Sequence, residues 1–285
     1  MRALFSLLVA VTVCACANEE STAPDVIAIG VLPGQSQSGL ATRYGPLVSY
    51  LQDATGLVIE LSIPANYEQM LDEFDAGRIH IANFGGVTFT QAEQRSGAVP
   101  LVMRDVDLDF ISCYIVRDPE PRRSVNEFEG EAFSFGPKLS TSGHMMPRHF
   151  LEESGITPED FFASVRHSSG HDQTIDWVLN GTIEIGVANC LIVQSLLSRG
   201  SDYDSLRVLE TTPPYGNYVW AAQSSLDASV TTLLTDAFLA LDPTNAEHLA
   251  ILRAQGANGY VPAGRNDFEA VRAAAREAGQ ISDER

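Results

Sequence analysis

The sequence predicts an α/β protein with two lobes, each a mainly parallel sheet flanked by helices. Strand-like and helix-like segments alternate over the first 85 residues and again between residues 132 and 188. That alternation predicts parallel strands with helices on both faces of the sheet. With 285 residues, 45% of them hydrophobic, the chain can bury a substantial core. Two such units predict a cleft between lobes, with ligands at the carboxyl ends of strands.

The first unit opens with an apolar run that ends at Pro33-Gly34, which is typical of a buried strand followed by a turn. Apolar side chains then recur three and four residues apart from Tyr44 to Leu51, which predicts a helix. The strands and helices expected in this unit are, in order, 26–32, 41–55, 58–63, 67–76 and 79–84.

The second unit has the same alternation. A strand is expected at 132–135, a helix after the turn at Ser140, a helix at 172–179 and a strand at 183–188. The spacing of apolar residues from 229 to 241 and from 268 to 278 predicts two further helices. Because no strands follow them, these helices are expected to pack on earlier structure.

The first residues are typical of an export signal. A positively charged start precedes an apolar run that is shorter than the about 20 residues needed to span a bilayer. Ala15 directly before Cys16 is typical of a bacterial lipobox. We therefore expect residues 1–15 to be a signal peptide cleaved before a lipidated Cys16, with residues 16–24 as a tether in the periplasm. The alternative is a plain signal peptide with incidental cysteines.

The charge of the chain excludes one class of partner. Lys and Arg number 18 against 37 Asp and Glu, a formal net charge of −19. Such a surface repels phosphate backbones, so nucleic acid is not expected as a partner. Net charge says nothing about a small anion in a local pocket, where the nearby groups decide.

Two cysteines, Cys113 and Cys190, lie beyond the predicted tether. They can pair in an oxidising compartment, or they can be two independent buried thiols. The sequence does not decide between the two, because it does not show how close their Cα atoms come.

The segment Ser140-Thr141-Ser142-Gly143 follows a predicted strand and opens a predicted helix. The first N–H groups of a helix have no intrahelical partners and carry about half a positive charge. Hydroxyls beside those donors make an anion site that needs no arginine. The alternative is an ordinary Ser/Thr N-cap.

A second candidate is His171, which stands before another expected helix. His167 and His171 are four residues apart, but Ser168-Ser169-Gly170 interrupts any helix, and no acid or cysteine stands at ligand spacing. We therefore expect no metal. At a helix start His171 could instead donate a hydrogen bond to an anion; the alternative is a partly buried histidine with ordinary partners.

Motifs of catalysis are missing from the sequence. It has no Gly-x-Ser-x-Gly, His-Glu-x-x-His, Walker or Gly-x-Gly-x-x-Gly motif. Nothing pairs a nucleophile with a base, so we expect neither an enzyme nor a cofactor.

Together these segments resemble the periplasmic phosphate-, phosphite- and phosphonate-binding proteins of ABC importers. The resemblance covers nearly the whole mature chain. The Ser-Thr-Ser-Gly motif and the Ser-Gly-His-Asp motif are specific when they occur together. The motifs include Tyr44-Gly45-Pro46-Leu47, Asn66-Tyr67-Glu68, Ile81-Ala82-Asn83-Phe84-Gly85, Ser140-Thr141-Ser142-Gly143 and Ser169-Gly170-His171-Asp172.

The resemblance implies a type II periplasmic binding protein fold, with two lobes on a two-strand hinge that close on an oxyanion. Residues 25–110 and 220–285 would form lobe I, and residues 111–219 would form lobe II. The ligand-binding residues that it implies are Ser140, Thr141, Ser142 and His171 from one lobe, and Tyr67, Phe84 and Gly85 from the other.

Some positions depart from the family pattern. Glu184 stands where the family commonly has an aspartate, His144 replaces an aromatic residue, and Phe110-Ile111 replaces paired tyrosines. Cys113 lies in the strand expected to cross between lobes. Arsenite-binding sensors resemble the same family and use a thiol near the cleft, which makes Cys113 a possible thiol ligand.

The expected function is therefore that of a monomeric, lipid-anchored solute-binding protein. It would capture phosphate, phosphite or a phosphonate and present it to an ABC permease. The alternative is a periplasmic oxyanion sensor, for example of arsenite through Cys113, that docks on a histidine kinase.

Overall fold

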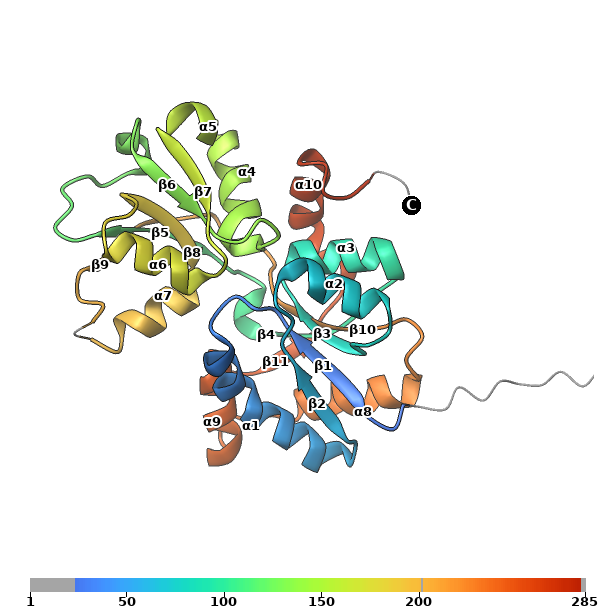
Figure 1. Cartoon of the computed structure of the whole chain (residues 1–285). Helices are drawn as coiled ribbons and strands as arrows, with labels where there is room; N and C mark the ends of the chain where they lie inside the picture. Colours follow the sequence, from blue (N-terminus) through green and yellow to red (C-terminus); the bar gives the residue numbers. More distant parts are fainter. Residues whose placement is uncertain (1–23, 201, 283–285) are drawn as a thin grey trace, which may run out of the picture.

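The computed structural model describes residues 24–200 and 202–282, which fold into two α/β lobes (Figure 1). The predicted signal peptide, Cys16 and all but the last residue of the tether lie outside those residues. Within them, no helix is both long enough and apolar enough to cross a membrane.

The first lobe is built on a six-stranded sheet in the order β11-β4-β10-β3-β1-β2. Strands β2, β1 and β3 are parallel, and they are the predicted N-terminal unit. Strands β10, β4 and β11 continue the sheet in antiparallel pairings. The strands are β1 (Ile27–Val31), β2 (Ile59–Ser62), β3 (Ile81–Phe84), β4 (Val99–Arg104), β10 (Val219–Ala222) and β11 (Tyr260–Pro262).

Helices cover both faces of this sheet. Leu47, Leu234 and Leu252 bring α1, α8 and α9 into one core cluster, and Phe74 and Phe89 bring α2 and α3 into another. The helices are α1 (Gln37–Thr55), α2 (Tyr67–Asp75), α3 (Gly86–Ser96), α8 (Ala228–Leu239), α9 (Ala246–Gln255) and α10 (Glu269–Glu277). The C-terminal helices thus pack on earlier structure, as predicted.

The second lobe is built on a five-stranded sheet in the order β7-β6-β8-β5-β9. Strands β7, β6 and β8 are parallel, whereas β5 pairs antiparallel with β8 and β9. Both sheets are therefore mixed, and the parallel part of each is its β-α-β unit. The strands are β5 (Ser112–Arg117), β6 (Ala132–Phe135), β7 (Ser164–His167), β8 (Ile185–Asn189) and β9 (Leu206–Thr211).

Helices cover this second sheet as well. Residues of α6 and α7 pack on one face, and Leu151 of α4 packs with Phe133 and Phe162 on the other. The helices are α4 (Met146–Glu153), α5 (Pro158–Phe161), α6 (His171–Leu179) and α7 (Cys190–Leu197). A π-helical turn, Thr141–Met145, runs directly into α4.

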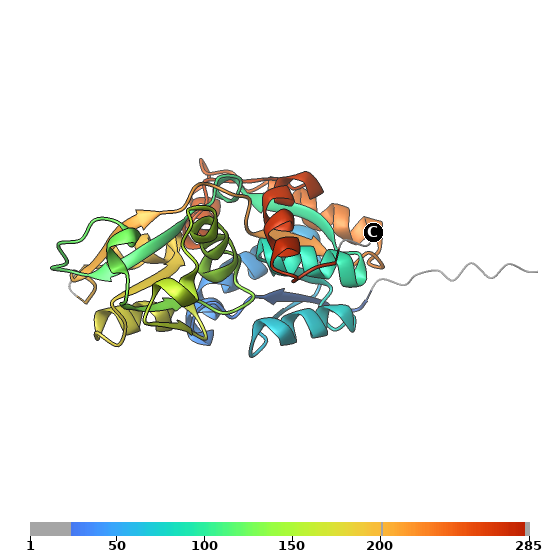
Figure 2. The same cartoon turned by 90° about the horizontal axis from the view of Figure 1, so that it is seen from above.

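Two extended segments connect the lobes (Figure 2). Phe110 in the first and Tyr215 in the second exchange two backbone hydrogen bonds of 2.9 Å each, so the segments form an antiparallel bridge. Strands of the first sheet come from residues on either side of the segment that forms the second sheet. The exact lobe limits, 25–110 with 220–285 and 111–219, stay a prediction.

Candidate ligand-binding cleft

An inner chamber with a volume of about 20 Å³ lies where the two lobes meet. Its walls come from the ends of β1, β3, β4 and β8, from the first turns of α1, α2 and α6, and from the second connecting segment. This is the carboxyl-end position expected for ligands of such sheets. The polar lining residues are Gln35, Arg43, Tyr44, Tyr67, Asn83, Arg104, His171, Asn189 and Tyr218.

His171 is a fully buried hydrogen-bond donor in this chamber. Its Nδ1 accepts a hydrogen bond of 3.3 Å from the backbone N–H of Asn189. Burial lowers the pKa of His171 to about 4, so the ring is neutral at physiological pH. In a neutral ring whose Nδ1 accepts, the proton is on Nε2, and Nε2 has no partner among the described residues. His171 therefore offers one N–H to a ligand.

Side chains near His171 also have free hydrogen-bond donors, because their acceptor atoms already accept hydrogen bonds from other residues. The Tyr44 hydroxyl donates to Asn83 Oδ1 at 3.0 Å, which leaves the Asn83 amide N–H groups as donors. The Asn189 amide donates to the Tyr218 hydroxyl at 3.1 Å, so the Tyr218 O–H can donate a hydrogen bond to another group. Burial raises the pKa of Tyr218, which keeps the phenol protonated. The chamber is lined by donors.

The three hydroxyls of the Ser140–Ser142 segment have different roles. Ser140 Oγ accepts from the backbone N–H of Gly143 at 2.9 Å, so Ser140 is the N-cap of its helical turn. Thr141 Oγ1 accepts from the backbone N–H of Val87 in the opposite lobe, also at 2.9 Å. Ser142 Oγ is buried, lies beside the Tyr218 phenol and has no partner of good geometry among the described residues. Of the three hydroxyls, that of Ser142 is the one without a partner among the described residues.

The ligand-binding residues expected from the first lobe, Tyr67, Phe84 and Gly85, lie in different places. Tyr67, the first residue of α2, lines the chamber, and its phenol lies beside Ser140. Phe84 is fully buried and packs edge-on against Phe74, with ring centroids 5.0 Å apart. Gly85 is the N-cap of α3 and faces Thr141 of the second lobe.

Among the described residues, three hydrogen bonds cross the cleft from one lobe to the other. Two of them flank the chamber at the start of α6, and the third caps α3, which has no side-chain cap of its own in the first lobe. The bonds run from His171 N–H to Gly34 O at 3.0 Å, from Ser36 N–H to Asp172 Oδ2 at 3.0 Å, and from Val87 N–H to Thr141 Oγ1.

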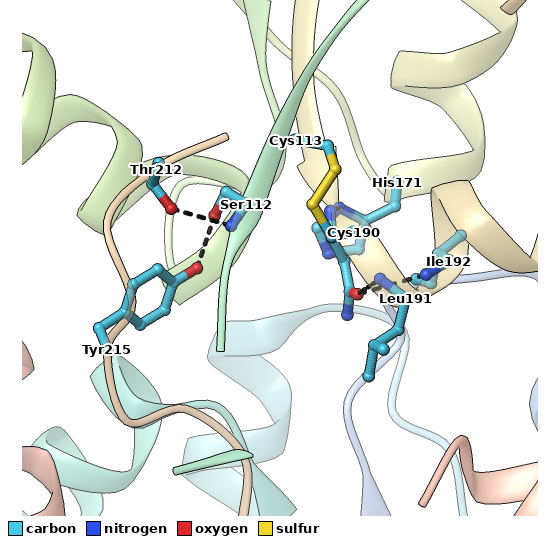
Figure 3. Close-up of a disulfide and its surroundings, with 9 residues drawn as sticks. Ser112, Cys113, His171, Cys190, Leu191, Ile192, Thr212 and Tyr215 are labelled. Atoms are coloured by element: carbon cyan, nitrogen blue, oxygen red, sulfur yellow. Dashed lines mark hydrogen bonds between the residues drawn. A yellow bond between two sulfur atoms is a disulfide. The ribbon is translucent and has the colours of Figure 1, made fainter. Parts of the chain in front are cut away.

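A disulfide joins Cys113 of β5 to Cys190 at the start of α7, with the Cα atoms 4.9 Å apart (Figure 3). The sulfur of Cys113 is thus bonded and buried, so it has no thiol to offer a ligand. The thiol-ligand alternative is not favoured by this pairing. Asn189 directly precedes Cys190, so the disulfide also anchors the residue that sets the His171 tautomer.

A family model described as the periplasmic substrate-binding protein of phosphonate ABC transporters matches residues 29–268. The chain belongs to this family. It is 27% identical over 271 residues to a probable ABC transporter phosphite binding protein, PhnD1, of Prochlorococcus marinus, covering 90% of this chain and 91% of that one. It is 25% identical over 229 residues to the phosphate-import protein PhnD of Mycolicibacterium smegmatis, covering 75% of this chain and 71% of that one.

Solved structures of such binding proteins have the same fold. The structure of Prochlorococcus PhnD1 in complex with methylphosphonate superposes with a TM-score of 0.85 at 24% identity, covering 90% of this chain and 99% of that one. A binding component of an ABC phosphonate transporter from Pseudomonas aeruginosa has a TM-score of 0.80 at 17% identity, covering 91% and 88%. The two-lobed α/β fold expected for the family is thereby confirmed.

Two of the positions expected to depart from the family pattern, Glu184 and His144, are not among the residues that line the chamber. Glu184 is exposed and accepts from the backbone N–H of Ala132. His144 bonds to the Lys138 carbonyl and to Arg148, and burial lowers its pKa to about 4. In the described chain, no group of three or more His, Cys, Asp or Glu side chains is placed to hold a metal ion.

Several chamber residues were not singled out from the sequence as ligand-binding residues. Asn83 and Asn189 end buried strands, and a polar residue after an apolar run is the signal that could have found them. Arg43 and Arg104 are brought to the chamber by α1 and β4, and no local pattern marks them. Arg104 forms a buried bidentate ion pair with Asp107, at 2.6 and 2.7 Å.

Proposed function

We propose that this protein captures phosphite or a phosphonate in the inner chamber and delivers it to the permease of an ABC importer. The observation that carries the proposal is the donor character of the chamber. His171, Tyr218 and Asn83 line the chamber and present protons, the unpartnered Ser142 hydroxyl lies beside Tyr218, and none of the described residues that line the chamber is an acid. An oxyanion needs donors on all of its oxygens and no acceptor.

The same character favours particular oxyanions. The dianions of phosphite and of a phosphonate have three bare oxygens, with a P–H or P–C bond as the fourth. Phosphate at neutral pH keeps at least one P–OH group, and no carboxylate among the described lining residues can accept its hydrogen bond, so only neutral oxygens are left for it. The chamber therefore favours phosphite and phosphonates over phosphate. The names of the Prochlorococcus protein and of its methylphosphonate complex agree with this choice.

The state of His171 supports a role in capture without catalysis. A histidine that acts as a general base needs a free lone pair on a ring nitrogen, but in His171 Nε2 has the proton and Nδ1 is occupied. A pKa of about 4 also makes the ring a weak base. The cleft thus works as a trap whose lobes close on the ligand.

We further propose that Cys16 is lipidated and anchors the protein to the periplasmic side of a membrane. The lipobox at Ala15-Cys16 supports this proposal. Radiolabelled palmitate incorporated into wild type and lost in Cys16→Ser is the expected result. Incorporation that persists in Cys16→Ser would contradict it.

The ligand-binding site is tested by calorimetry with methylphosphonate and phosphite. Ser142→Ala removes one donor to a charged oxygen, which is worth about 1.5–3 kcal/mol, so affinity should fall about 10- to 150-fold. Ser134→Ala is the matched control, because that buried serine of the same lobe donates to the Phe135 carbonyl. Binding that is unchanged in Ser142→Ala, or absent from the wild type, would overturn the proposal.

A further inference from the structure

A second, larger cavity adjoins the inner chamber at the mouth of the cleft, and we call it the outer vestibule. It has a volume of about 730 Å³, against about 20 Å³ for the chamber. Gln35, Arg43 and Ile192 line both, so the two cavities adjoin at these three residues. A volume of several hundred Å³ is typical of sites for small organic ligands.

Both lobes form the walls of the vestibule. The first lobe contributes the start of α1 and the end of α9, and the second contributes α6, α7 and the segment after α7. The vestibule borders the chamber at the three residues that line both cavities. A substituent longer than a methyl group would therefore lie in the vestibule.

Three arginines line the vestibule, namely Arg43, Arg199 and Arg253. None of them has a carboxylate within 4 Å among the described residues. Arg43 Nε is moreover buried without a partner, and one of its terminal nitrogens donates to the Gln255 carbonyl. In a chain with a net charge of −19, three cations without carboxylate partners in one cavity are an unusual concentration.

The vestibule also has two acids, and their positions limit their effect. Asp172 accepts the Ser36 N–H at 3.0 Å and so already belongs to the contact between the lobes. Asp176 is exposed one turn further along α6. The cations outnumber the acids, and the one acid nearest the chamber is already hydrogen-bonded.

We infer that the outer vestibule is a subsite for a negatively charged substituent of an organophosphonate. The inference rests on the proposed function, because the phosphonate group itself occupies the inner chamber. Guanidinium groups bind carboxylates and phosphoryl groups through paired N–H donors, which suits them to a second acidic group on the ligand. Ligands with a carboxylate at the end of a short chain should then bind more tightly than neutral ligands of the same length.

Calorimetry with four phosphonates tests this subsite: methylphosphonate, pentylphosphonate, 4-carboxybutylphosphonate and 4-aminobutylphosphonate. The wild type should bind the carboxylated compound at least about tenfold more tightly than the pentyl compound, and this preference should shrink in high salt. The double variant Arg199→Gln/Arg253→Gln should lose the preference and keep its affinity for methylphosphonate. Both arginines are exposed, so the fold should tolerate the change.

The matched control is Arg123→Gln/Arg166→Gln, which removes the same charge from two exposed sites of the second lobe that lie outside the vestibule. It should keep the preference for the carboxylated compound. Equal binding of the carboxylated and pentyl compounds, tighter binding of the amine, or loss of the preference in the control would overturn the inference. If methylphosphonate itself does not bind to the wild type, the proposed function fails first.

Discussion

Gly85 offers a direct test of lobe closure, because a side chain there would meet the opposite lobe. A Cβ added to Gly85 would lie 2.9 Å from Thr141 Oγ1, whereas ordinary contacts begin at 3.4 Å. The other neighbours, Asn217 Oδ1 and Leu32 Cδ1, are 3.6 and 3.7 Å away. The backbone of Gly85 is extended, with φ −79° and ψ 164°, so alanine fits it without strain. The clash therefore exists only when the lobes are closed.

When the lobes of the Gly85→Ala variant close, Thr141 must move by about half an ångström, which weakens its hydrogen bond to Val87. Overpacking of this kind costs about 1–3 kcal/mol, so calorimetry should find an affinity about 5- to 150-fold weaker. The unfolding temperature of the ligand-free protein should change by less than about 2 °C, because the open lobes avoid the contact. Gly259→Ala in the same lobe is the control, since its Cβ would meet nothing within 4 Å.

A double-mutant cycle identifies the cause of that loss. In a Thr141→Ala background the clashing oxygen is gone, so adding Gly85→Ala should weaken binding no further. An equal loss in both backgrounds would refute the clash with Thr141, and wild-type affinity in Gly85→Ala would refute this closed arrangement of the lobes.

Three further predictions concern the elements that hold the cleft. Asp107→Asn should lower the free energy of unfolding by about 3–5 kcal/mol in urea titrations, because it leaves the buried Arg104 guanidinium uncompensated; a loss below 1 kcal/mol would contradict this. Replacing Cys113 and Cys190 by alanine should cost about 4 kcal/mol in the same assay, since the disulfide closes a loop of 77 residues; an unchanged midpoint would contradict it. Burial lowers the folded-state pKa of His171 from 6.5 to about 4, so the free energy of unfolding of the wild type should fall as pH drops from 6.5 to 4. In His171→Gln the slope of this free energy against pH should be smaller by the equivalent of about one bound proton. Equal slopes would argue against a buried neutral ring.

The sequence predicted the parallel core of each lobe because local periodicity is strong there. The runs at 26–32, 58–63 and 79–84 became β1, β2 and β3 with shifts of a few residues at their ends. Strands β10 and β11 were not foreseen, since they join the first sheet from the far end of the chain. Their pairing depends on tertiary contacts that no local pattern contains.

The candidate site was predicted in part, for a similar reason. The motifs around Ser140 and His171 marked the correct helix starts, but a motif does not say what each hydroxyl touches. Thr141 is occupied by the opposite lobe and Ser140 by its own turn, which only the closed structure reveals. The pairing of Cys113 with Cys190 was left open because it depends on a distance between strand and helix.

The measurement closest to the central claim is the calorimetric affinity of the purified protein for phosphite and phosphate between pH 5.5 and 8. His171 stays neutral over this range, so a change in affinity reports the protonation of the ligand. A chamber of donors predicts that phosphite binds about 5- to 150-fold more tightly than phosphate at pH 8, since one buried hydroxyl without a carboxylate acceptor costs about 1–3 kcal/mol. It also predicts that phosphite binding weakens as the pH falls. Phosphate bound as tightly as phosphite, or phosphite bound more tightly in acid, would contradict the account.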